Sequence, residues 1–114
     1  MTDPRLRQLI IKTGVVKRLT KEKTVYEREV VIERQRLDKF KTEGADEHVL
    51  KKQEEVIEEC LMMLPDAVRR LQREYALLQK FLEDEVELKE TKEYVVAEQV
   101  LAAAEEVIPK NVKF

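Results

Sequence analysis

The sequence is short of residues that interrupt helices. Its 114 residues include only two glycines, three prolines and six aromatic residues, and it has no tryptophan. Charged residues make up 40% of the chain and hydrophobic residues 43%. Such a mixture, rich in Glu, Lys, Arg, Leu, Val and Ala, is typical of long helices with solvated faces. The chain is too hydrophobic and too periodic for an intrinsically disordered protein.

The chain also lacks the features of secreted and membrane proteins. Cys60 is the single cysteine, which excludes an internal disulfide and suits a reducing compartment. The N-terminal stretch "MTDPRLRQ" has no apolar signal core. No apolar run approaches the roughly 20 residues that a membrane span needs. We therefore expect a soluble, intracellular protein.

Residues arranged for catalysis or metal binding are missing as well. His48 is the single histidine, and Cys60 falls on an apolar helix face without a histidine partner. There is no glycine-rich loop that could hold a phosphate. One acidic cluster is read as a solvated helix face rather than a catalytic pair: Glu54, Glu55, Glu58 and Glu59. The sequence therefore argues against an enzyme, and we expect no metal site and no cofactor.

Charge is unevenly distributed although the net charge is only −2. Residues 1–42 hold 12 Lys and Arg against 6 Asp and Glu, whereas residues 43–83 hold 6 against 10 and residues 84–114 hold 4 against 8. Either these segments pair with one another inside a bundle, or the basic first segment attracts an acidic partner.

The first predicted helix spans residues 4–42. Asp3 is placed to cap it, Pro4 suits its first turn, and Gly44 suits its end. Seven of ten positions at a three-four spacing are apolar, which favours an amphipathic helix in a bundle. The stripe is Leu9, Lys12, Val16, Leu19, Lys23, Tyr26, Val30, Glu33, Leu37 and Phe40. Gly14 lies inside this helix, where it either admits close approach of another helix or is a tolerated weak point.

The second predicted helix spans residues 46–83 and contains Pro65. Asp46 is its candidate N-cap. Its apolar stripe keeps its register on both sides of the proline, from Leu50 through Leu64 and Leu71 to Leu82. Because Leu64 would be a poor cap for a new helix, we expect one helix that continues through Pro65 and is kinked there.

A third helix is predicted over residues 88–108, followed by a loose tail at 109–114. A continuous helix to residue 107 would leave half of its apolar stripe without a partner, so a turn is expected near 83–88. The stripe resumes as Tyr94, Ala97, Leu101, Ala104 and Ile108. The predicted fold is therefore all-α: a single domain over residues 1–114, an elongated antiparallel three-helix bundle with up-down-up topology.

Two stretches combine unusual residues in a fixed order. "IKTGVVKRL" (residues 11–19) has a glycine inside a helix, and "MMLPDAVRRL" (residues 62–71) places a proline and an aspartate after two methionines. With the sequence around them, from residue 3 to about residue 101, they resemble the tubulin-binding cofactor A family of tubulin-specific chaperones.

The resemblance implies a three-helix bundle that captures β-tubulin after its release from the chaperonin. The bundle would hold β-tubulin for the later cofactors that assemble the α/β-tubulin heterodimer. It also implies a cytoplasmic, cytoskeleton-associated protein that is not an enzyme and needs no cofactor. Other tubulin-folding cofactors are further expected partners.

Tubulin is an acidic protein, so basic residues are the best candidates for contact with it. They lie on the first helix (Lys12, Lys17, Arg18, Lys21) and just beyond the proline (Arg69, Arg70, Arg73). Met62 and Met63 are adaptable apolar side chains beside the proline, one of which can pack inward while the other points toward a partner. For each of these residues the alternative is a purely structural role or a solvated face.

Two other functions remain open at this stage. The apolar stripe would also suit a structural adaptor that self-associates, and the sequence leaves open whether the chain is a monomer or a homodimer. Basic residues in "KRLTKEK" would suit an electrostatic binder of nucleic acid, but interleaved glutamates and the acidic whole-chain charge argue against it. Several apolar residues off the stripe either widen the core or form exposed contacts: Ile10, Val15, Val25, Val31, Ile32, Val68 and Phe81.

Overall fold

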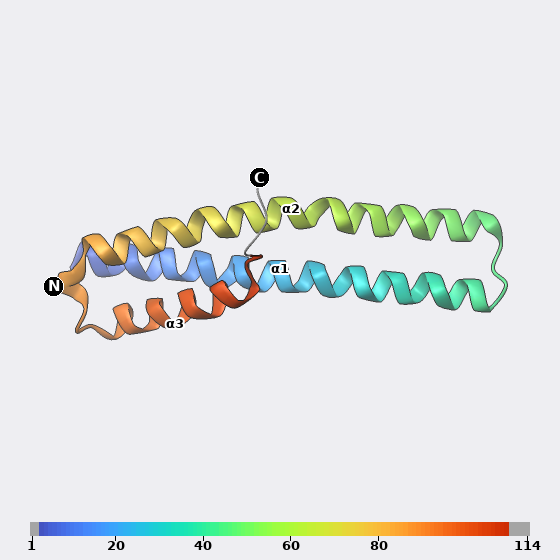
Figure 1. Ribbon diagram of the computed structural model, residues 1–114. Coiled ribbons are helices and arrows are strands. Elements are labelled where there is room, and N and C mark those ends of the chain that lie inside the picture. The colour runs from blue at the N-terminus through green and yellow to red at the C-terminus, as the bar shows by residue number, and fades with distance from the viewer. Residues whose placement is uncertain (1–2, 110–114) are drawn as a thin grey trace.

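Three α-helices form an elongated rod (Figure 1). The computed structural model describes residues 3–109, with α1 at Pro4–Thr42, α2 at Glu47–Asp84 and α3 at Lys92–Val107. A short 3-10 turn, η1, covers Val86–Leu88. The rod measures 64 × 28 × 19 Å along its principal axes. The prediction of an all-α protein with three helices is confirmed for the described residues.

The third helix accompanies the other two over only part of their length. Figure 1 shows α2 lying beside α1 from end to end, and α3 beside the part of that pair that contains the N-terminus. α3 packs mainly against α1 and less against α2. The rod therefore has a part in which α3 covers the pair, named here the three-helix half, and a part beyond the end of α3, named here the two-helix half.

The first two helices begin next to the capping residues that the sequence predicts. The Asp3 carboxylate accepts a hydrogen bond from the amide of Arg5 at 2.9 Å, and Asp46 accepts one from the amide two residues on, also at 2.9 Å. These bonds satisfy first-turn donors that have no partner inside the helix. Gly44 ends α1 with a φ of 72°, a left-handed conformation that glycine adopts at little cost.

The third boundary differs from the prediction. α3 begins at Lys92 rather than at residue 88, because Thr91 is its N-cap. The Thr91 hydroxyl accepts a hydrogen bond from the Tyr94 amide at 3.2 Å and donates one to the Leu88 carbonyl at 2.6 Å. The Tyr94 hydroxyl then donates to the Leu82 carbonyl at 3.1 Å and so ties the start of α3 to the end of α2.

The apolar core is concentrated in the three-helix half. Its buried cluster consists of Leu9, Val16, Leu19, Leu71, Leu78, Leu82, Leu88, Tyr94, Ala97, Leu101 and Ala104. Leu19, Leu71 and Leu101 are therefore core residues, as the stripes predict. Leu64 is only half-buried, because it lies in the two-helix half, where no third helix covers the pair.

Pro65 lies inside α2, so the helix continues through the proline as predicted. The kink at this position stays a prediction. Met62 and Met63 are both exposed, with 76% and 49% of their surface accessible, so the expectation that one of them packs inward is wrong. Two neighbouring methionines on the outer side of a helix leave flexible apolar surface open to solvent.

Two polar side chains on the inner faces of α1 and α2 each have a polar partner. The Gln53 amide donates to the Glu33 carbonyl at 2.9 Å and to the Glu33 carboxylate at 2.7 Å, which links α2 to α1. The Lys23 ammonium, on a side chain 8% exposed, lies 2.6 Å from the Glu27 carboxylate. Such pairing offsets the cost of removing polar groups from water.

Candidate functional site

The predicted basic residues of α1 do not share one environment. Lys12 is half-buried and its ammonium lies 5.8 Å from the centre of the Phe81 ring, so it contributes to the α1–α2 contact. Lys17 and Lys21 are exposed and form no salt bridge within the described residues. Arg18 is exposed and lies 3.8 Å from Glu22 one turn further on. Three of the four residues therefore remain available to a partner.

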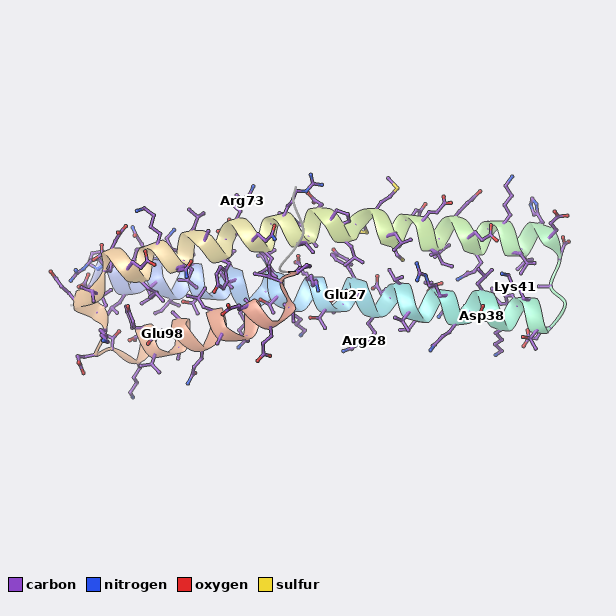
Figure 2. The ribbon with its side chains drawn as sticks, in the orientation of Figure 1. Glu27, Arg28, Asp38, Lys41, Arg73 and Glu98 are labelled. Carbon is purple, nitrogen blue, oxygen red and sulfur yellow. The ribbon has the colours of Figure 1, made fainter. Side chains whose placement is uncertain are left out.

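The predicted residues of α2 gather on its outer side. The Arg69 guanidinium donates to the Pro65 carbonyl at 3.4 Å. Arg70 lies 3.5 Å from Asp66, and Arg73 lies 3.9 Å from Glu74. These contacts lie within one helix, and the Arg70 and Arg73 side chains keep 41% and 66% of their surface exposed. Figure 2 shows Arg73 projecting away from α1.

The two basic sets do not form a single patch. The apolar stripes of α1 and α2 face each other, so residues on their outer sides point in different directions. Lys17 lines a hollow between α1 and α3, whereas Arg73 projects from α2 on the side away from α1 (Figure 2). The structure thus places the predicted basic residues of α1 and α2 on two separate parts of the surface.

A groove between α1 and α3 was not predicted from the sequence. It begins as a hollow of about 380 Å³ lined by Ile10, Thr13, Gly14, Lys92, Glu93 and Val96. It continues as a second hollow of about 270 Å³ lined by Lys17, Thr20, Val96, Gln99, Val100 and Ala103. Val96 lines both, so the two hollows are neighbours along the three-helix half, and together they are named here the α1–α3 groove.

A different hollow lies between α1 and α2 in the two-helix half. Its lining residues are Arg34, Leu37, Asp38, Glu54, Ile57 and Glu58. Three carboxylates against one guanidinium make this hollow acidic, in contrast to the α1–α3 groove.

The residues that could carry out catalysis are not assembled. Burial raises the pKa of the Cys60 thiol, and the carboxylates of Glu29 and Glu33 raise it further, so the thiol stays protonated at neutral pH. His48 is exposed near the start of α2. The described part of the chain contains no cluster of three or more His, Cys, Asp or Glu side chains arranged to hold a metal ion. None of the helices within residues 3–109 combines the length and low charge of a membrane-spanning helix.

A sequence model of the family described as tubulin binding cofactor A matches residues 4–101. The chain belongs to the tubulin binding cofactor A family. The tubulin-specific chaperone A of Gallus gallus is 50% identical to it over 101 residues, which cover 89% of this chain and 94% of the relative. The family resemblance in the sequence is thus confirmed.

Solved members of the tubulin binding cofactor A family share the fold. The human tubulin chaperone cofactor A is 43% identical, with a TM-score of 0.78 over 90% of this chain and 99% of that one. The tubulin folding cofactor A of Arabidopsis thaliana is 39% identical, with a TM-score of 0.83 over 90% of this chain and 96% of that one. The names of these relatives describe chaperones and folding cofactors.

Two sequence signals pointed toward the α1–α3 groove without defining it. Ile10 fell off the apolar stripe, and Gly14 was an unexplained glycine inside a helix. The groove itself depends on how α3 lies across α1. That placement depends on contacts between residues far apart in the sequence. The periodicity of one helix does not predict where a distant helix will pack against it.

Proposed function

We propose that this protein is a tubulin-folding chaperone that captures β-tubulin intermediates. It holds them for later cofactors that assemble the α/β-tubulin heterodimer, and it acts in the cytoplasm in association with the cytoskeleton. The match of the tubulin binding cofactor A family to residues 4–101 supports this proposal, together with a relative, covered to 94% of its length, that is named a tubulin-specific chaperone.

The surface of the rod suits reversible capture of a protein. Large apolar side chains are exposed on all three helices, among them Ile11, Met62 and Val95, with 58%, 76% and 46% of their surface accessible. Lys17 and Lys21 of α1 are exposed as well, and neither forms a salt bridge within residues 3–109. Apolar contact supplies affinity, and the cations steer an acidic partner toward the rod. We further propose an up-down-up topology with a bend at Pro65, which would shape this surface.

Co-purification from a eukaryotic lysate tests the proposal. We expect a stoichiometric β-tubulin band with the wild-type chain. A self-associated chain without tubulin would instead indicate a structural adaptor, and a strongly salt-dependent nucleic-acid complex would indicate an electrostatic binder.

Reversal of charge at Lys17 and Arg18 should slow the capture of β-tubulin. Both side chains are exposed, so Lys17→Glu with Arg18→Glu should leave the bundle folded. At low salt the association rate measured by stopped-flow fluorescence should fall by roughly tenfold, because charges near an interface act mainly on association. The difference should shrink as salt shortens the Debye length to about 8 Å.

The matched control reverses two exposed acidic residues of α2, by Glu54→Lys with Glu55→Lys. It should not slow association, because it removes negative charge that repels an acidic partner. Equal rates for the wild type and both double variants across the salt series would show that the cations of α1 do not steer β-tubulin.

A further inference from the structure

The α1–α3 groove has the length and lining to accept another helix. Its α1 side runs from Ile10 to Thr20, about 15 Å at 1.5 Å per residue, which matches about ten residues of a docked helix. Ile10 and Val96 stand on its two sides with 54% and 48% of their surface exposed. A groove between two packed helices, with apolar residues on both sides, is the usual docking place for the apolar face of an amphipathic helix.

Gly14 has no role in packing within the described chain. A Cβ atom built at this position meets no atom within 4 Å, so no other segment of the described chain approaches it. Glycine inside a helix is less favourable than alanine, and here no internal contact offsets that cost. Thr13, Thr20 and Ala103 continue the lining with small side chains. A glycine on the wall of an open groove would let the backbone of a partner helix come close.

The charges at the groove select an acidic occupant. Lys17 and Lys92 line it, and Lys21 follows one turn beyond Lys17, whereas Glu93 is the single carboxylate in the lining. None of the three lysines forms a salt bridge within residues 3–109. Their ammonium groups are therefore free to pair with carboxylates at the edges of a docked helix. The acidic hollow of the two-helix half would repel the same helix.

We propose that the α1–α3 groove binds an amphipathic helix of the captured β-tubulin, with its apolar face on Ile10 and Val96, its backbone against Gly14 and its flanking carboxylates on Lys17 and Lys92. This inference rests on the proposed function and names the part of the rod that carries it out.

Gly14→Leu separates binding from folding. The leucine fills the groove with a bulky side chain, yet it is a much better helix former than glycine and meets no atom of the chain at its Cβ. The variant should therefore melt at a temperature equal to or above that of the wild type. Its Kd for purified β-tubulin, measured by biolayer interferometry on the full chain, should rise by about 10- to 100-fold because the partner helix can no longer approach.

Two further variants sharpen the measurement. Ala76→Leu adds the same side chain at an exposed position of α2 outside the groove, and its Kd should stay within about twofold of the wild type. Lys92→Glu places a carboxylate in the first turn of α3, which favours that helix end while removing a groove cation. It should weaken binding at low salt and approach the wild type at high salt.

The outcomes distinguish the two proposals. Wild-type binding with unchanged binding by Gly14→Leu, or equal loss in Gly14→Leu and Ala76→Leu, overturns the groove and leaves the chaperone function standing. No binding of β-tubulin by the folded wild-type chain overturns both. Loss confined to Gly14→Leu and Lys92→Glu supports the groove as the docking surface.

Discussion

Leu71→Ala is expected to lower the free energy of unfolding by about 2–5 kcal/mol. Leu71 has no accessible surface and belongs to the core cluster of the three-helix half. The substitution removes buried methyl and methylene groups and leaves a cavity that the surrounding helices fill only in part. Urea denaturation followed by circular dichroism at 222 nm measures the change.

Leu77→Ala is the matched control on the same helix. Leu77 has 46% of its surface exposed, so its truncation should cost no more than about 1 kcal/mol. Equal losses at the two positions would mean that α2 does not present Leu71 to the core, and the packing of the three-helix half would have to be revised.

Removal of the countercharge of Lys23 should produce the second large effect. The Lys23 side chain is 8% exposed and its ammonium is 2.6 Å from the half-exposed Glu27 carboxylate. Glu27→Gln leaves a largely buried ammonium without a charged partner, and we expect a loss of about 1–3 kcal/mol in the free energy of unfolding. Lys23→Met should have the opposite sign or no effect, because it removes the buried charge and retains a side chain of similar volume.

Glu22→Gln gives the control for the chemical change itself. Glu22 pairs with Arg18 at 3.8 Å on the same helix, where the Arg18 side chain is 67% exposed. An exposed pair of this kind contributes about 0–1 kcal/mol, so the variant should unfold close to the wild type. A loss as large as that of Glu27→Gln would show that burial of Lys23 is not the cause.

Features determined by neighbouring residues were predictable from the sequence. Asp3, Gly44 and Asp46 act within two to four residues of their own position, and all three end or begin helices as expected. The start of α3 differs from the predicted residue 88 because Thr91 is its N-cap. No glycine or proline marks that boundary, and Thr91 acts together with Leu88 of a 3-10 turn.

Features determined by contacts between helices were predictable only in part. The stripe of α1 was correct even at a polar position, because Glu33 faces α2 and accepts two hydrogen bonds from the Gln53 amide. The sequence does not show which residues of a stripe lie under α3. Leu64 belongs to the predicted stripe of α2 but is only half-buried, because α3 does not cover that part of the pair. The α1–α3 groove was missed because a helix periodicity gives the direction of a face and not the distance to the next helix.

The elongated shape has a hydrodynamic consequence. A compact chain of 114 residues would have a radius of gyration of about 13 Å, whereas this rod has 19.3 Å. A long, thin particle meets more friction in water than a sphere of the same mass, so it diffuses more slowly and leaves a gel-filtration column earlier. A single copy of this chain should therefore elute at the position of a larger globular protein. Light scattering, which measures mass independently of shape, is therefore the appropriate way to distinguish one copy from two.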